Sequence, residues 1–535
     1  MRAKASSIRD EVLVAILVGT LLSIAWIACT WRYGFDVADE GYYWYGAQRL
    51  LRGEIPMRDF MAYDIGRYAW TAAIMGKLGD DGIFGARMGA AIYQLFTIPI
   101  GVLIALRAVN GQLGTFEKII FAAILTALLN LWVYPYYKVF DYGTSILIVA
   151  MLTLMMTSQC TQSWFGAGLI LGIAAIMGRN HGVYGAFAAL LLSGFLLLKQ
   201  DRSAVLTKPM LAFVAGTIVG FSPTFVMAML IDGFAGGFIE SVRELVRGGA
   251  TNLSLPVPWP WTFSKSHMGW LYWATDVTKG LAFIAIVLVP IVAILALMRR
   301  PLGQFGTVHN IILCSSFAGI AYAHYAYSRA DLTHLALSIA PLILALPGIA
   351  ALVGHPIAMA TTLLGVSILA LAPGVPYLAQ PILKKPLTTI SVSGTNLYAS
   401  PWINARLQNA EHVFEFIPNA RDSFLAIPDS PGLYAIYKKK MQIWEIYSLW
   451  PRDPLFERSE LSRLQVNAPQ VIFLSNHALD GRSELRYSST HPILYRWIVD
   501  NYRLEPALQE SPHPPWEVYV RKSSDRMLRS ERSLQ

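Results

Sequence analysis

Residues 12–40, VLVAILVGTLLSIAWIACTWRYGFDVADE, decide the class of fold, because an apolar stretch of membrane-spanning length leads directly into a cluster of acids. About 20 helical residues cross roughly 30 Å of hydrocarbon, and the stretch up to Trp31 meets that length. Its start is basic and it lacks a clear small-residue cleavage site, so we expect a retained first span and not a removed signal peptide. The sequence therefore places Asp36, Asp39 and Glu40 just outside a membrane.

The rest of the chain is similarly apolar. Of its 535 residues, 55% are hydrophobic and 14% are charged, whereas about a quarter of the residues in an ordinary soluble domain are charged. We therefore expect an α-helical polytopic membrane protein. Hydropathy predicts about eleven spans, at residues 11–31, 85–106, 117–135, 142–160, 164–178, 183–198, 209–231, 277–298, 307–326, 334–352 and 356–379.

The basic residues predict an orientation. With the N-terminus in the cytoplasm, the cytoplasmic loops hold Arg2, Lys4, Arg9, Arg107, Lys118, Lys199, Arg202, Lys208, Arg299 and Arg300. This distribution satisfies the positive-inside rule and accounts for the net charge of +9 without a nucleic-acid partner. It also indicates an odd number of spans in a plasma (inner) membrane, with the C-terminal part extracytoplasmic.

The composition changes near residue 380, where apolar runs shorten and turn-forming pairs appear. We expect strands at 432–437, 470–474 and 516–520 and a helix at 491–502. The chain is thus predicted to have a membrane domain at 1–379, with its main outside loop at 32–84, and a small soluble α/β domain at 380–535.

The outside loop 32–84 has two predicted amphipathic helices. One follows Asp39 and Glu40 and ends near Arg52, before Gly53; the other covers about 66–78. Both are expected to lie in the membrane interface. Asp39 could simply cap the first helix and Glu40 could favour its dipole. Three acids within five residues, followed by several basic residues, favour proton transfer beside a phosphate site.

A wider resemblance extends this hypothesis. Residues 36–60, DVADEGYYWYGAQRLLRGEIPMRDF, resemble the first external loop of the GT-C superfamily of membrane glycosyltransferases, particularly its protein O-mannosyltransferase and aminoarabinose lipid A transferase branch. Residues 137–141 resemble the second acidic position of that superfamily, and 178–182 and 328–334 resemble polar outside turns of bacterial members. The tail from Phe424 resembles their soluble domain. Residues 63–68, YDIGRY, replace the Pro-Pro pair common in this branch, which leaves the subfamily open.

The resemblance implies an enzyme that moves a sugar from a polyprenyl-phosphate donor to an acceptor hydroxyl at the extracytoplasmic face, with inversion. It implies Asp39 as general base, Asp36 and Glu40 as alternatives and Asp141 as a supporting acid. The acceptor could be a glycan, a lipid or a protein. Arg58, Arg67 and Arg179 are candidates for the donor phosphate, and the further candidates for substrate contact are Tyr42, Tyr63, His181, Arg329, Asp331 and His334.

Other interpretations stay open. Basic residues at an interface also anchor to lipid head groups, and Arg329 could merely pair with Asp331. No HExxH-like spacing is present, so we predict no metal site, although some superfamily members use a divalent cation with these acids. A transporter or flippase of a lipid-linked glycan is one rival function, but such proteins usually place ionisable residues within their spans. A non-catalytic cell-envelope assembly protein on the same scaffold is the other.

Overall fold

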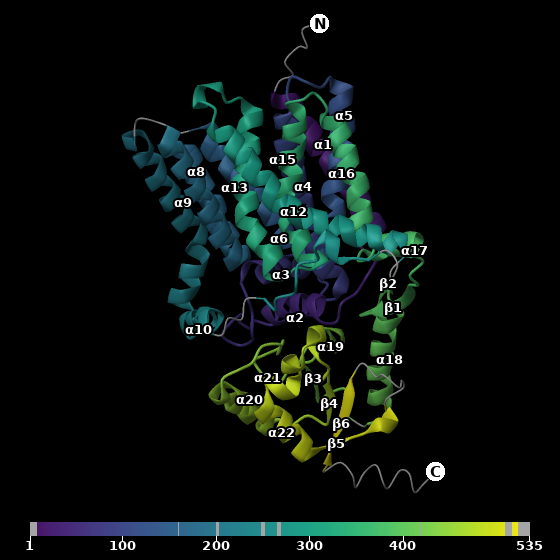
Figure 1. Ribbon diagram of the computed structural model, residues 1–535. Coiled ribbons are helices and arrows are strands. Elements are labelled where there is room, and N and C mark those ends of the chain that lie inside the picture. The colour runs from purple at the N-terminus through teal and green to yellow at the C-terminus, as the bar shows by residue number, and fades with distance from the viewer. Residues whose placement is uncertain are drawn as a thin grey trace.

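Long apolar helices form the upper part of the molecule in the computed structural model, which describes residues 8–158, 160–199, 203–247, 252–264, 269–417, 419–508 and 516–522 (Figure 1). Their outward faces expose large apolar side chains such as Leu21, Leu211 and Leu288, as expected of helices that face lipid. The helices of this part are α1 (Ile8–Thr30), α2 (Asp39–Leu51), α3 (Gly66–Leu78), α4 (Ile83–Ala108), α5 (Thr115–Leu131), α6 (Val139–Thr157), α7 (Thr161–Met177), α8 (Arg179–Lys199), α9 (Ser203–Leu230), α10 (Phe234–Arg247), α12 (Trp270–Met298), α13 (Thr307–Ser328), α14 (Leu332–Ser338), α15 (Ala340–Ala351), α16 (Pro356–Leu371) and α17 (Pro376–Leu383).

The described residues contain six helices that are long and apolar enough to cross a membrane, or up to eight if each of two bent pairs is one span. The bent pairs are α14 with α15 and α16 with α17. Helices α5, α7 and α13 match the remaining predicted segments but are too short or too polar for that test, so eleven spans remains a prediction. Figure 1 places the start of α1 and the C-terminal part at opposite ends of the helical bundle, as an odd number of crossings requires.

The predicted outside loop is covered by protein, which corrects one expectation. Helix α2 is expected from the sequence to lie in the membrane interface, but every residue from Glu40 to Arg49 is buried within the protein. The helix lies between the membrane helices above and the C-terminal part below (Figure 1), and its aromatic side chains belong to the buried hydrophobic core. Helix α3 has the predicted bounds and ends at Gly79, whose left-handed backbone (φ 64°) suits a glycine.

The C-terminal part is a small α/β unit. A hairpin of β1 (Thr388–Val392) and β2 (Thr395–Ala399) precedes a four-stranded sheet of order β3-β4-β6-β5, in which only β3 and β4 are parallel. The elements of this sheet and its cover are α18 (Pro401–Phe416), β3 (Phe424–Ile427), α19 (Gly432–Tyr437), α20 (Pro454–Val466), β4 (Val471–Leu474), α21 (Tyr487–Thr490), α22 (Pro492–Asn501), β5 (Tyr502–Leu504) and β6 (Glu517–Arg521).

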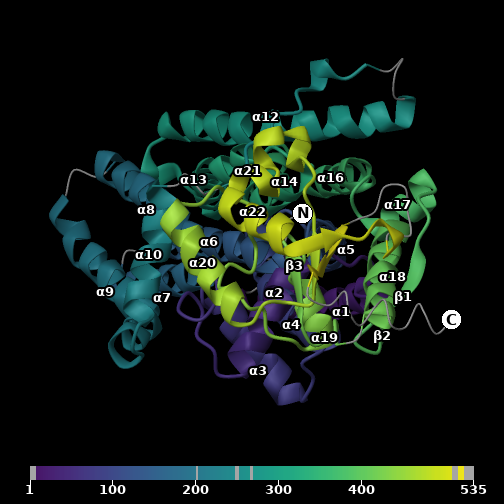
Figure 2. The same cartoon turned by 90° about the horizontal axis from the view of Figure 1, so that it is seen from below.

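Most of the predicted elements of this part are present, but residues 432–437 form helix α19 and not a strand. A short apolar run has no decisive period of its own, and tertiary packing determined the outcome. Gly432 donates its backbone N–H to the Val37 carbonyl oxygen at 2.9 Å and lies directly against Gly41 of α2, where a side chain on either glycine would clash. The close approach of α19 to α2 thus joins the C-terminal part to the first outside loop (Figure 2).

Candidate active site

A cavity of about 360 Å³ lies where the membrane helices meet the C-terminal part. Its walls come from the start of α2, from α3, α6, α8 and α13, and from two segments of the C-terminal part. Four cationic and three anionic side chains line it, so the cavity suits a negatively charged ligand. The lining residues are Asp39, Tyr63, Asp64, Arg67, Lys138, Asp141, Arg179, Asn180, Tyr184, Asn252, Leu253, His324, Tyr325, Ser328, Arg329, His334, Tyr447, Leu449, Trp450 and Leu479.

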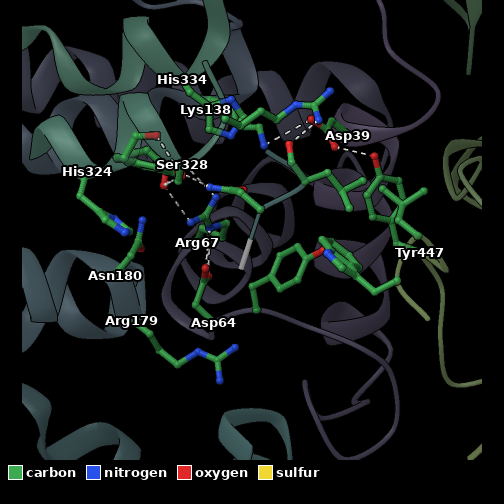
Figure 3. A pocket seen from close by; sticks show the side chains of 18 of the residues that line it. Asp39, Asp64, Arg67, Lys138, Arg179, Asn180, His324, Ser328, His334 and Tyr447 are labelled. Carbon is green, nitrogen blue, oxygen red and sulfur yellow. Dashed lines mark hydrogen bonds and ion pairs between the residues drawn. The ribbon is translucent and has the colours of Figure 1, made fainter. Parts of the chain in front are cut away.

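Asp39 is the carboxylate of the acidic cluster that reaches this cavity (Figure 3). Its Oδ1 accepts a hydrogen bond from the Tyr447 hydroxyl at 2.8 Å, and its Oδ2 lies 3.3 Å from Lys138 Nζ. Burial opposes its charge, but Lys138, Tyr447 and His334 outweigh burial and hold the pKa of Asp39 below its usual 3.8. With about a third of its side chain exposed (34%), Asp39 is an ionised acceptor that a ligand can reach.

Asp36 lies behind Asp39 and does not line the cavity. Its oxygens accept hydrogen bonds from the Ala38 backbone N–H and the Tyr137 hydroxyl, each at 2.8 Å. Burial and the nearby charge of Asp39 raise the pKa of Asp36 to about 6. The pKa values of these two neighbouring acids therefore shift in opposite directions, because only Asp39 has a cation beside it.

Glu40 is tied into the scaffold. Arg87 of α4 donates to both of its carboxylate oxygens, from Nε at 2.7 Å and from Nη2 at 2.9 Å, and both side chains are buried. The same guanidinium also donates to the carbonyl oxygens of Trp31 and Gly34. This fork holds the chain between α1 and α2, and Glu40 does not line the cavity.

Arg67 is clamped between two carboxylates on the opposite wall. It donates to Asp64 from Nε at 3.0 Å and to Asp141 from Nη1 and Nη2 at 3.1 and 3.3 Å. Burial opposes its charge, but Asp141 and Asp64 hold the pKa of Arg67 well above its usual value. Asp141 is further bonded to His181 and to the Tyr325 hydroxyl, both at 3.1 Å, and is almost fully buried.

Arg179 donates to a neutral side chain. Its Nη1 donates to the Ser241 hydroxyl of α10 at 2.9 Å, and in the part of the chain that the structure describes no carboxylate lies within ion-pair distance. Figure 3 shows Arg179 and Asn180 on the side of the cavity away from Asp39, with Arg67 between. Arg179 therefore offers the least compensated positive charge on this wall.

The remaining predicted residues divide between the cavity and its surroundings. Tyr63, Arg329 and His334 line it, whereas Tyr42, His181 and Asp331 stand behind the lining. Arg329 pairs with Asp331 at 2.9 Å, as the alternative interpretation expected, and also forms two bonds with Asp480, at 2.6 and 2.8 Å.

Arg58 does not reach the cavity. It forms a two-pronged pair with its neighbour Asp59, at 2.9 and 2.8 Å, and also donates to the carbonyl oxygen of Asp232. Its predicted role at the donor phosphate therefore has no support from its position.

Several residues of the site carried no signal in the sequence. Tyr447, Trp450 and Leu479 come from the C-terminal part, far along the chain from the acidic loop. Lys138 belongs to the quoted stretch 137–141, and its position three residues before Asp141 could have suggested a cation beside the acids. The tyrosines Tyr184 and Tyr325 look like ordinary residues of apolar helices until the fold brings them together.

Among the described residues, no group of three His, Cys, Asp or Glu side chains is arranged to hold a metal ion. The position beside Asp39 that a cation would fill has the amino group of Lys138. We therefore assign no chemical step to a metal.

The fold, in contrast to the sequence, has recognisable relatives. No family model and no curated protein matches the chain. The apo structure of ArnT from Cupriavidus metallidurans matches with a TM-score of 0.50 and 11% identity, over 94% of this chain and 97% of that chain. ArnT bound to undecaprenyl phosphate matches at 0.48 and 12% over the same shares, and the apo Archaeoglobus fulgidus oligosaccharyltransferase at 0.44 and 12%, over 97% and 75%. The chain thus shares, over nearly its whole length, the fold of ArnT.

Proposed function

We propose that this protein is a membrane glycosyltransferase that moves a sugar from a polyprenyl-phosphate donor to an acceptor hydroxyl in the cavity beneath the membrane helices. One observation carries the proposal: a single cavity joins an ionised, reachable carboxylate, Asp39, to a cationic wall with Arg67 and Arg179. The neighbours with this fold include a protein bound to undecaprenyl phosphate and one with dolichol phosphate, which supports a donor of this class.

The proposed reaction needs one base and one anion site. The acceptor hydroxyl oxygen forms a bond to the anomeric carbon while the bond from that carbon to the phosphate oxygen breaks, and the hydroxyl proton passes to Asp39. A single displacement of this kind inverts the anomeric carbon. A carboxylate with a low pKa is a weak base at rest, so Asp39 takes the proton only as the hydroxyl becomes acidic in the transition state.

The leaving polyprenyl phosphate gains negative charge as the sugar departs. Preorganised cations stabilise such charge best in a site that excludes water. Arg67 shares its charge with Asp64 and Asp141, whereas Arg179 has no carboxylate partner among the described residues. We therefore assign the main contact with the donor phosphate to Arg179 and a supporting one to Arg67.

The proposed site faces the extracytoplasmic side of a plasma membrane. The positive-inside distribution of basic residues supports a cytoplasmic N-terminus. The cavity is lined by residues of the membrane helices and of the C-terminal part, and that part lies at the end of the bundle opposite to the start of α1 (Figure 1). Residues 380–535 would then form an extracytoplasmic domain that closes the cavity from outside.

Transfer of a labelled sugar tests the proposal. Purified protein in lipid nanodiscs is given a panel of polyprenyl-phosphate sugars with glycan, lipid and peptide acceptors, and Asp39→Asn is run beside it. We expect transfer by the wild type and a loss of about 10²- to 10⁴-fold in Asp39→Asn, the usual contribution of a general base. No transfer across the panel, or equal rates for both proteins, would contradict the proposed activity.

A further inference from the structure

A partly buried segment without regular structure runs from the C-terminal part to the cavity. It comprises residues 441–452, MQIWEIYSLWPR, within the connection between α19 and α20, and we name it the strap. Connections of more than about 12 to 15 residues without secondary structure are uncommon in compact domains, and many of them are functional. Six of the twelve residues of the strap are buried and only Pro451 is exposed, because the strap lies against the first outside loop.

Backbone groups fix the strap to that loop at three places. The Met61 N–H donates to the Trp444 carbonyl oxygen at 2.9 Å, and the Trp444 indole N–H donates to the Met57 carbonyl oxygen at 3.3 Å. The Met441 N–H donates to the Tyr45 hydroxyl at 2.8 Å. The strap therefore has one fixed register relative to the loop that carries Asp39.

A buried ionic cluster fixes the strap from the other side. Glu445 pairs with Arg452 Nε at 2.5 Å and with His491 Nε2 at 2.9 Å, and both Glu445 and His491 are at most 1% exposed. Glu460 of α20 accepts the backbone N–H groups of Trp444 and Glu445 at 2.7 and 3.1 Å. Arg452 also reaches Glu244 of α10 at 3.4 Å, so the cluster spans both parts of the molecule.

The strap places the Tyr447 side chain next to Asp39, the proposed base. The Tyr447 side chain is buried, lies against Tyr42 with ring centroids 5.3 Å apart, and donates its hydroxyl to Asp39 Oδ1 at 2.8 Å. Lys138 occupies the side of Oδ2. Together they fix the carboxylate plane, and each oxygen retains lone-pair capacity for a substrate hydroxyl.

We propose that the C-terminal domain completes the active site through the strap, and that Tyr447 is a positioning residue that sets the orientation and proton affinity of Asp39. The value of this role for catalysis rests on the proposed glycosyl transfer. The contact between Tyr447 and Asp39 itself can be tested without any turnover.

Tyr447→Phe is the direct variant, because it removes one hydroxyl and keeps the ring. The control is Tyr437→Phe, which removes a tyrosine-to-carboxylate bond of the same kind, to Glu411 at 2.9 Å, in the same domain and away from the cavity. Size-exclusion profiles and thermal midpoints in detergent confirm that both variants fold.

The first measurement is chemical. Asp39 of the full chain is labelled with a water-soluble carbodiimide and an amine over a pH range that extends from well below the usual carboxyl pKa of 3.8 to neutral pH, and the extent is read by mass spectrometry. Loss of the hydrogen bond to the charged form raises the pKa of a carboxyl group. We expect the midpoint of Asp39 labelling to rise by about half a pH unit or more in Tyr447→Phe, and to stay unchanged in Tyr437→Phe. An unchanged midpoint in Tyr447→Phe, or an equal rise in both variants, would overturn the inference.

The second measurement is the pH dependence of sugar transfer. We expect Tyr447→Phe to lower kcat by about tenfold, as for loss of a charge-assisted hydrogen bond, and to move the acidic limb of the rate profile upward. The KM for the donor should change little. A lower kcat with an unmoved limb would indicate a merely structural role and overturn the inference. A shifted labelling midpoint without any transfer by the wild type would instead refute the proposed function and leave the contact established.

Discussion

Asp39 and Asp141 are two carboxylates of one cavity, yet their surroundings assign them opposite roles. Asp39 is 34% exposed and bonded to Tyr447 and Lys138. Asp141 is 1% exposed and bonded to Arg67, His181 and Tyr325. An open carboxylate can accept a proton from a ligand, whereas a closed one holds its neighbours in place. The difference between them shows that the number of partners, and not the residue type, identifies the candidate base.

The physical reason is the cost of burying charge. A carboxylate shut away from water is tolerated only when cations and hydrogen-bond donors compensate it. Asp141 has such compensation on both oxygens, and in return it aligns Arg67 along the cavity wall. Asp39 is partly exposed to water and needs fewer compensating cations and donors. One side of its carboxylate therefore stays available to a substrate.

The largest expected effect is on the stability of the closed site. Asp141→Asn removes one of the two carboxylate charges that compensate Arg67, and breaking a buried ion pair from one side costs about 3 to 5 kcal/mol. Asp39→Asn should cost less than about 1 kcal/mol, because its carboxylate is partly exposed. Thermal and denaturant unfolding in detergent measures both. Equal destabilisation by the two variants would break the comparison.

A conservative replacement of Arg67 sharpens the same point. Arg67→Lys keeps the charge but cannot reproduce the forked contact with Asp141. We therefore expect it to restore little of the stability that Arg67→Met loses. Full restoration by lysine would indicate that charge alone, without the fork, holds this wall.

The second expected effect is on the KM for the donor and concerns two arginines that differ in their partners. Arg179 has no carboxylate partner among the described residues, whereas Arg58 is paired with Asp59 outside the cavity. We expect Arg179→Gln to raise the KM for the donor about 10- to 100-fold, since a hydrogen bond to a charged group contributes about 1.5 to 3 kcal/mol. Arg58→Gln is the matched control and should change this KM less than about twofold. Initial rates over a range of donor concentrations measure both, and a larger effect at Arg58 would contradict the assignment.

Local sequence was enough for the elements that precede the site. The apolar length of the first span predicted α1 and the amphipathic pattern of residues 66–78 predicted α3, and both helices are present. The prediction that acids gather at one end of the molecule rested on topology alone, and Figure 3 shows Asp39 and Asp64 at one cavity. These features depend on short stretches of chain, and they can therefore be predicted from a single sequence.

The contacts that separate the acids could not be predicted in this way. Tyr447 is 408 residues from Asp39, and Asp141 is 74 residues from Arg67. Glu40 has the same local signal as Asp39, and only the position of Arg87 on α4 reveals that it is a scaffold residue. Pairings between distant segments follow from packing, and no local periodicity records them.

The smallest expected effect is on the pH dependence of stability, and it comes from Asp36. This carboxyl group is intermediate between the partly exposed Asp39 and the fully compensated Asp141. It has two hydrogen-bond donors but no cation, and its pKa is raised to about 6 by burial and by Asp39. Because the folded state binds this proton more tightly than the unfolded state, its contribution to stability is full below about pH 3.8 and is lost as the pH rises through about 6. Asp36→Asn, which stays neutral, should therefore match the wild type near pH 4 and gain about 1 to 2 kcal/mol by pH 7.

Asp59→Asn provides the control with the opposite sign. Arg58 and a backbone N–H hold the pKa of Asp59 below its usual value against some burial. Its stabilisation is present above about pH 3.8 and is lost as the pH falls below that value, so its removal should lower stability at pH 7. Unfolding measured from pH 4 to 8 for both variants decides the matter. If Asp36→Asn also lost stability at pH 7, Asp36 would belong with the compensated carboxylates, and proximity to a cation would no longer separate the three acids.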